Sequence, residues 1–389
     1  MRREAIEAMC SLIEGGEYNA SALYAEGRAA RTALDRARMT VAALVGAKSR
    51  EIVFTSGGSE SNTLAIAGTL RARVGGVAGA HIVTAATEHH AVLHAIDAMR
   101  DEGARVTVLG VDADGRLDPA AFATALEPET VLATIMLANN EVGTIAPISD
   151  LARLARAHGV LFHCDAVQAA GRLPLDVDTL GIDLLSLSAH KCYGPKGVGA
   201  LYVRTGTPLG AVVYGGPQES GRRAGTENVA GIAGFAAAFA ATEAERTGEM
   251  RRLEGLRDRL EREILATIPG SAINAVAAPR LGTIASVAFE GIDAMELLVA
   301  LDLAMISVST GSACAAGAAE RSHVLAALDA QAWIRRGTLR FSLGRHTSEQ
   351  DVVRLTRMLP AAVAAGRVGS RNVGTSMGGS PQSLSEVYS

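Results

Sequence analysis

The stretch SLSAHKCYGPKGVG, residues 186–199, places Lys191 directly after an apolar run, residues 182–187, that is typical of a strand. Lysine is rare in this chain and otherwise occurs only as Lys48 and Lys196. An amine at the edge of an apolar region has a lowered pKa, which leaves it able to attack an aldehyde and form a Schiff base. The alternative is a strand-end lysine that reaches solvent, as most lysines do. The neighbouring motifs must decide between the two.

The composition indicates an ordinary globular enzyme. The chain has 389 residues, of which 48% are hydrophobic and 20% charged, enough for a large core and two domains. A formal charge of −4 and the lack of a basic stripe with interleaved aromatics predict no nucleic-acid partner. Residues 1–17 resemble an amphipathic helix without an export signal, and no apolar run is long enough to span a bilayer. We therefore expect a cytoplasmic protein with no membrane segment.

The four cysteines lie far apart in the sequence, without the paired spacing of a structural zinc site or a disulfide framework. They are Cys10, Cys164, Cys192 and Cys314. We expect free thiols, and for the first three the usual position of a small buried core residue.

Short apolar or β-branched runs alternate with longer helical stretches between about residues 55 and 203. The runs are residues 81–84, 105–109, 131–137, 160–163, 182–187 and 199–203. This alternation predicts an α/β fold with a mostly parallel sheet covered by helices on both faces. Ligands of such sheets bind at the carboxyl ends of the strands.

A helical tract over residues 228–266 has the length of a spine that joins this domain to a smaller one. After it the pattern is α+β. It predicts strands over 286–290 and 338–343, and helices over 294–303, over 322–330 and from 348 onward. The predicted organisation is an N-terminal helix (1–14), a large domain (15–245), a small domain (246–365) and a Gly/Ser-rich disordered tail (366–389).

Two motifs that follow strands could bind a phosphorylated ring. In TSGGSESN, residues 55–62, the turn at Gly58 and Ser59 opens a helix whose amides can hold a phosphate, although helix capping explains the same residues. In HCDAVQA, Asp165 can keep a pyridine nitrogen protonated, with Gln168 three residues further on. The alternative for this aspartate is a helix cap.

Two further motifs end at the same predicted sheet edge. TEHHAV places His89 at a strand-to-helix junction, where an imidazole can stack on a ring or move a proton. ANNEVGT places Asn139 and Asn140 after a strand, where their amides can bind a ligand oxygen. A solvated histidine and a turn asparagine are the alternatives. Because all of these motifs meet at one edge, a joint cofactor site explains them better than separate coincidences.

Seven motifs, in this order, resemble those of the cysteine desulfurases: TSGGSESN, NNEVGT, FHCDAVQA, SLSAHKCYGPKGVGALYVR, GGPQESGRRAGTEN, STGSACAAG and RFSLGR. These enzymes are a branch of the pyridoxal-phosphate class V aminotransferases. The resemblance covers about residues 19–360, and GGPQESGRRAGTEN is most similar to the nitrogen-fixation type. It implies the aspartate-aminotransferase-like fold (fold type I), with a mostly parallel seven-stranded sheet in the large domain and a smaller α+β C-terminal domain.

The resemblance also implies roles for individual residues. Lys191 would bind the aldehyde of pyridoxal 5'-phosphate. The other implied cofactor contacts are Gly58, Ser59, Ser188 and His190 at the phosphate, Thr226 from the partner subunit of a homodimer, and Asp165, Gln168, His89 and Asn140 around the ring. Arg340, helped by Asn140, would bind the carboxylate of L-cysteine.

STGSACAAGAAE, residues 309–320, places Cys314 among small residues that are typical of a mobile loop. Such a thiol can reach a bound ligand and then an external acceptor. By the resemblance, Cys314 takes the sulfur of L-cysteine as a persulfide, L-alanine leaves, and the sulfur passes to an iron–sulfur scaffold or another acceptor protein. The similarity to the nitrogen-fixation type favours nitrogenase as the destination, and the general housekeeping type is the alternative. We expect no catalytic metal, although Cys314 could contact a transferred cluster.

The chain departs from the family in one region that matters for the site. The family opens with a strand and turn close to LDNAATT, whereas this chain begins directly in a helix, so we expect a misassigned or truncated start or a site that lacks one wall. Three other functions stay open: a selenocysteine lyase, a pyridoxal-phosphate aminotransferase, and a non-enzymatic sulfur-carrier or scaffold subunit.

Overall fold

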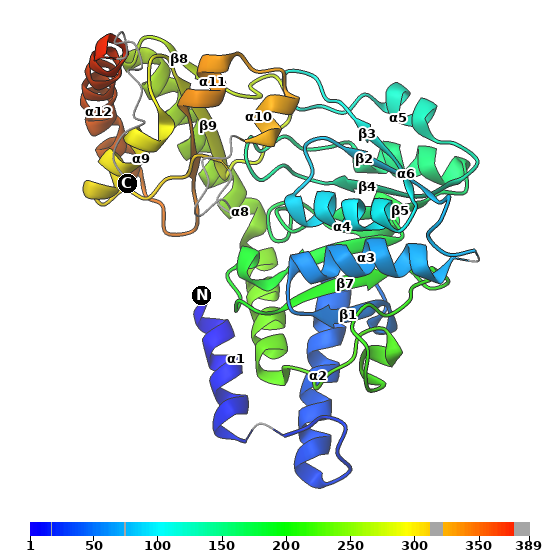
Figure 1. Cartoon of the computed structure of the whole chain (residues 1–389). Helices are drawn as coiled ribbons and strands as arrows, with labels where there is room; N and C mark the ends of the chain where they lie inside the picture. Colours follow the sequence, from blue (N-terminus) through cyan, green and yellow to red (C-terminus); the bar gives the residue numbers. More distant parts are fainter. Residues whose placement is uncertain (17, 74, 312–321, 377–389) are drawn as a thin grey trace, which may run out of the picture.

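The computed structural model describes residues 1–16, 18–73, 75–311 and 322–376, and Cys314 lies outside them. A large domain and a small domain share one long helix, α8 (Val229–Thr267), which runs from one into the other (Figure 1). The helical tract predicted over residues 228–266 is confirmed. No helix in the described ranges is long and apolar enough to cross a membrane.

The large domain is built on a seven-stranded sheet in the order β1-β7-β6-β5-β4-β2-β3. The strands are β1 (Ile52–Thr55), β2 (His81–Ala85), β3 (Arg105–Leu109), β4 (Thr130–Met136), β5 (Leu161–Asp165), β6 (Leu184–Ser188) and β7 (Gly199–Val203). All neighbours pair in parallel except β7, which is antiparallel to both β1 and β6. The predicted mostly parallel sheet is thus confirmed, and the strands that bear the site motifs end at the same edge.

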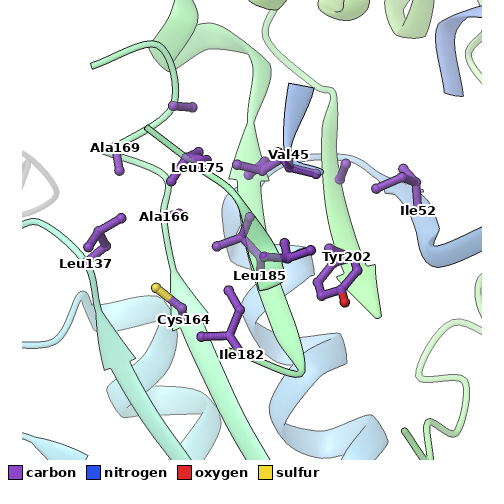
Figure 2. Close-up of a cluster of buried hydrophobic side chains, with 14 of the residues drawn as sticks. Val45, Ile52, Leu137, Cys164, Ala166, Ala169, Leu175, Ile182, Leu185 and Tyr202 are labelled. Carbon is purple, nitrogen blue, oxygen red and sulfur yellow. The ribbon is translucent and has the colours of Figure 1, made fainter. Parts of the chain in front are cut away.

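Helices cover both faces of this sheet, which explains why its strands are apolar on both sides. One face packs against α3 (Gly58–Ala72) and α4 (His90–Asp101). The other packs against α2 (Ala25–Leu44), α5 (Pro119–Ala125), α6 (Ile148–Ala157) and the first half of α8. Figure 2 shows part of this second core, where the Cys164 thiol lies among apolar side chains. Cys164 therefore faces away from α3, whereas its neighbour Asp165 faces toward it.

Three short helical segments complete the large domain. They are η1 (Ser49–Glu51), α7 (Val177–Leu180) and η2 (Ala189–Cys192), and a fourth turn, η3 (Gln218–Gly221), precedes α8. The turn η2 follows β6 directly and carries Lys191.

Helix α1 (Arg3–Glu14) packs along α8, which lies between α1 and α2 (Figure 1). It is anchored at its start by Arg2, which is 1% exposed and donates from Nε to Thr242 Oγ1 at 2.9 Å. Cys10 is exposed, so the prediction of a buried thiol at this position was wrong. The buried face of α1 contains Ala5 but does not include Cys10.

The small domain has its own core around the second half of α8. A three-stranded antiparallel sheet in the order β10-β9-β8 packs with the surrounding helices. The elements are β8 (Ser271–Ile273), β9 (Ile284–Phe289), α9 (Ala294–Leu303), α10 (His323–Ala327), α11 (Ala332–Gly337), β10 (Thr338–Ser342) and α12 (Glu349–Ser376). Two of these elements, β8 and α11, were not predicted because they are too short to show a period.

The C-terminal helix continues further than the sequence predicted. Helix α12 ends at Ser376, so residues 366–376 are helical and the prediction of a disordered tail from Gly366 was wrong for them. Arg367 explains part of the extension, because its guanidinium donates to the carbonyls of Glu290 at 2.8 Å and Pro269 at 2.7 Å. These bonds hold the helix against the small domain. Residues 377–389 lie outside the described residues.

Candidate active site

A cavity of about 290 Å³ lies where β4, β5 and β6 end, between the large domain and β10 of the small one. It brings together ten of the predicted site residues: Gly58, Ser59, His89, Asn140, Asp165, Gln168, Ser188, His190, Lys191 and Arg340. These residues come from six segments that are far apart in the sequence. The carboxyl edge of the sheet is thus a single site, as the motifs predicted.

The turn that carries Lys191 is fixed by hydrogen bonds on several sides. Ala189 N–H donates to the carbonyl of Val198 at 3.0 Å, and the hydroxyl of Thr242 on α8 donates to the carbonyl of Cys192 at 3.0 Å. The turn ends at Tyr193, which has a left-handed φ of 64°. A non-glycine residue in this conformation is held there by its surroundings. The Lys191 side chain therefore enters the cavity from a rigid base.

Asp165 is a buried acid that lines the cavity, with 4% exposure. Its Oδ1 accepts from the backbone N–H of Val167 at 2.9 Å, and its Oδ2 accepts from Asn62 Nδ2 on α3 at 2.7 Å. Burial raises the pKa of the carboxyl, and these two hydrogen bonds act in the opposite direction. The acid is thus oriented by neutral donors, which suits it to pair with a cationic group of a ligand.

The start of α3 is open to an anion. Among the described residues no side chain caps this helix terminus, and Ser59 lies in its first turn, so backbone amides face the cavity. Gly58 leaves room for Val167, since a Cβ at position 58 would lie 2.6 Å from Val167 Cγ2 and one of the two side chains would have to shift. Next to this helix start, Ser188 Oγ and His190 Nδ1 are 2.9 Å apart. These groups form a site with the chemistry of a phosphate cradle.

His89 caps α4 through its ring. Its Nδ1 accepts from the backbone N–H of Ala91 at 3.0 Å, so the proton of the neutral ring is on Nε2. Burial lowers the pKa of His89, and the carboxylate of Asp165 opposes this effect. The ring therefore lies in the cavity as a neutral imidazole that can donate from Nε2.

Arg340 approaches from β10 of the small domain. Its Nη1 donates to the backbone carbonyl of Asn140 at 2.8 Å and to that of Gly311 at 3.1 Å. Gly311 has a φ of +103°, and a Cβ there would meet Glu141 Oε2 at 2.7 Å, so glycine is needed at this position. The guanidinium is thus positioned by both domains at the wall of the cavity, where it can bind a carboxylate.

Gln168 follows Asp165 on the same turn and lines the cavity. Its Oε1 accepts from Arg172 Nη1 at 3.2 Å, which turns the amide nitrogen into the group available for donation. Two predicted residues are not part of this cavity. Thr226 is exposed and lines other pockets of the same chain, and Cys314 lies outside the described residues.

Some residues of the site were not predicted, among them Asn62, Glu141 and His323, which line the cavity, and Glu88, which lies behind it. Each lies in or beside one of the motifs quoted above. The sequence does not show that its side chain points toward the cavity, so it could not be predicted as a site residue. Glu88 is completely buried, accepts from the N–H of Met136 at 2.7 Å, and has its pKa raised well above the usual value by burial. It is therefore a buried acid behind the site, whose protonated form is favoured by burial.

Pyridoxal 5'-phosphate fits the residues of this cavity. A lysine amine, an oriented and buried carboxylate, and a phosphate cradle at a helix terminus surround one space. They match the three parts of the cofactor: the aldehyde, the ring nitrogen and the phosphate. Within the described ranges, no group of histidine, cysteine and acidic side chains is arranged to hold a metal ion.

Comparison with known proteins agrees with this geometry. The family model "Aminotransferase class-V" matches residues 2–355. A cysteine desulfurase IscS from Dictyoglomus turgidum is 44% identical over 352 residues, which cover 90% of this chain and 89% of the relative. The cysteine desulfurase NifS of Azotobacter vinelandii is 41% identical over 362 residues, covering 93% of this chain and 89% of the relative.

Solved structures give the same result. A NifS-like protein superposes with a TM-score of 0.87 at 30% identity and covers 94% of this chain and 96% of its own. SspA in complex with cysteine superposes with a TM-score of 0.77 at 34% identity and covers 90% of this chain and 97% of its own. The chain therefore belongs to the class V aminotransferase family, in the branch of the pyridoxal-phosphate-dependent cysteine desulfurases.

Proposed function

We propose that this protein converts L-cysteine to L-alanine and transfers the sulfur to Cys314 as a persulfide. The observation that carries the proposal is the arrangement of Lys191, Asp165 and Arg340 around one cavity at the end of the sheet. An amine, an acid and a guanidinium so placed can hold an amino acid by its carboxylate beside a pyridoxal ring. The relatives named cysteine desulfurase support the choice of cysteine as the substrate.

The bound cofactor supplies an electron sink for the carbanion at the substrate Cα. The residues of the chain do the rest. Arg340 binds the substrate carboxylate as a fork, Asp165 keeps the ring nitrogen protonated, and Lys191 moves the proton at Cα through Nζ. His89, neutral and protonated on Nε2, can deliver a proton to the substrate Cβ. Each of these roles is assigned to a side chain that lines the cavity.

The sulfur step needs a nucleophilic thiolate. Its Sγ attacks the substrate sulfur, the bond between sulfur and Cβ breaks, the electron pair of that bond goes to Cβ, and a proton at Cβ completes alanine. Burial raises the pKa of Cys192 to about 12 and that of Cys164 well above its usual value. Neither forms a thiolate at neutral pH. Cys10 is exposed on α1 and does not line the cavity, which leaves Cys314 as the proposed nucleophile.

A homodimer would explain the position of Thr226. The loop that carries it is fixed on its own subunit, because Arg223 Nε donates to Glu60 Oε1 at 2.8 Å and Arg38 forms two hydrogen bonds with Glu219. Thr226 itself is exposed. We propose that it completes the phosphate site of the partner subunit. Light scattering of the purified protein should give the mass of two chains, and a monomer with full activity would contradict the proposal.

The proposal also concerns the protein that receives the sulfur. We propose a role in iron–sulfur cluster assembly in the cytoplasm through a scaffold or other acceptor protein. Relatives of similar identity are named IscS or NifS, so both a housekeeping role and a supply to nitrogenase are compatible with them. Deletion of the gene in its host, scored for nitrogenase activity and for a housekeeping iron–sulfur enzyme, separates the two roles.

The test of the proposed reaction compares Lys191→Ala with Lys196→Ala. Lys196 lies five positions further on, is exposed and does not line the cavity. Wild type and Lys196→Ala should bind pyridoxal phosphate with a visible absorbance band and release alanine from cysteine. Lys191→Ala should lose both the band and alanine release. Alanine release by Lys191→Ala at the wild-type rate would refute the proposal.

A further inference from the structure

His323 lines the cavity, but it has no role in the proposed reaction. It begins α10, directly after Ser322, and its ring centroid lies 4.4 Å from that of His90. The side chain thus belongs to the site by position, although it is not part of any cofactor motif.

A backbone carbonyl determines which ring nitrogen of His323 carries a proton. His323 Nε2 lies 2.9 Å from the carbonyl oxygen of Glu88, and a carbonyl only accepts, so Nε2 carries the proton. Glu88 is itself fixed, since it is completely buried and its carboxyl accepts from Met136 N–H. In the neutral form of the ring, Nδ1 is therefore a bare acceptor. This atom is buried and has no hydrogen-bond partner within the part of the chain that the structure describes.

A buried acceptor without a partner is costly unless a ligand supplies a donor. L-cysteine brings three polar groups to the site. Arg340 suits the carboxylate and the cofactor aldehyde takes the amine, so the thiol is the donor that remains. Three carboxylate oxygens of the cavity already accept hydrogen bonds: Glu141 Oε2 accepts from Ser322 Oγ at 2.5 Å, and the two oxygens of Asp165 accept from Asn62 and Val167.

We propose that His323 Nδ1 accepts a hydrogen bond from the substrate thiol and is a specificity-determining residue for sulfur. An ordinary cysteine thiol has a pKa of about 8.5 and keeps its proton at neutral pH. A selenol is more acidic and is ionised there, so it has no proton to donate to a bare nitrogen. His323 therefore favours cysteine over selenocysteine. This inference rests on the proposed function and names the feature of the site that selects its substrate.

The test measures thiol recognition without turnover. Calorimetry on the cofactor-loaded protein compares 3-mercaptopropionate with butyrate, in which a methyl group replaces the thiol. Wild type should bind the thiol compound about three- to tenfold more tightly, the range of one hydrogen bond.

The variants remove the acceptor in two ways. His323→Gln keeps a donor for the Glu88 carbonyl but loses Nδ1, and His323→Leu removes both. His94→Gln is the matched control, because His94 is exposed on α4 and does not line the cavity.

Loss of the preference in His323→Gln, with the preference intact in His94→Gln, supports the assignment. A folded Gln or Leu variant that keeps the wild-type preference overturns it. The same variants should show a smaller ratio of cysteine to selenocysteine turnover than wild type, and an unchanged ratio also counts against the role. Failure of the proposed reaction would appear differently, as absence of alanine release in wild type while the preference between the two ligands persists.

Discussion

Asn62 determines how well Asp165 can hold a cationic ring nitrogen. In the structure Asn62 Nδ2 donates to Asp165 Oδ2 at 2.7 Å, and this bond opposes the effect of burial on the pKa of the acid. The substitution Asn62→Leu removes the donor at similar size. Its other amide atom, Oδ1, is buried without a partner in the described residues, so the apolar replacement costs little on that side.

A hydrogen bond to a charged group contributes about 1.5–3 kcal/mol. Pairing with a pyridinium nitrogen requires the ionised form of Asp165, to which this bond is strongest. The loss should therefore weaken binding of pyridoxal phosphate by about tenfold to a hundredfold. Because the pKa of Asp165 rises further without Asn62, the affinity of the variant should also begin to fall at a higher pH on acidification than that of wild type.

The assay is fluorescence titration of cofactor-free protein with pyridoxal phosphate across a range of pH. Thr69→Val is the matched control, because Thr69 lies on the same helix, is 1% exposed like Asn62, and has a hydroxyl without a partner in the described residues. It should bind the cofactor as wild type does. Equal affinity of Asn62→Leu and Thr69→Val would refute the reasoning.

Two further predictions concern stability. The pKa of Glu88 is raised well above its ordinary value of 4.5, so the folded protein keeps a proton that the unfolded chain releases, and the free energy of unfolding should fall as pH rises toward the raised pKa. Glu88→Gln should flatten this dependence in urea unfolding between about pH 5 and pH 8; parallel curves for the two proteins would exclude the assignment. Arg38→Leu should cost about 3–5 kcal/mol in the same assay, since it leaves Glu219, 1% exposed, without its ion-pair partner. Arg31→Ala, which removes a pair exposed on the same helix, should cost under about 1 kcal/mol, and similar losses for both arginines would contradict the reasoning.

The sequence was sufficient to predict the sheet and most of the cofactor residues because both depend on local patterns. An apolar run followed by a polar residue indicates a strand end, and parallel strands bring their ends to one edge. Lys191, Asp165 and His89 could be placed in this way. The small elements β8 and α11 could not, since they have too few residues for a period and form through packing in the small domain.

Residues whose role depends on a contact with another site residue were harder to predict. Asn62 and His323 acquire their roles through contacts across more than 100 positions of sequence, with Asp165 and Glu88 respectively. No local pattern contains that information. The prediction of a disordered tail failed for a similar reason, because the contacts of Arg367 with the small domain offset the Gly/Ser-rich composition.

The most direct measurement is peptide mass spectrometry of the cofactor-loaded protein after one turnover with L-cysteine labelled in its sulfur. Four cysteines can be told apart in the same digest: Cys10, Cys164, Cys192 and Cys314. We predict one labelled sulfur atom on Cys314 and an equal amount of alanine in solution. Label on Cys10, Cys164 or Cys192 instead, or alanine formed without any labelled cysteine in the protein, would contradict the account.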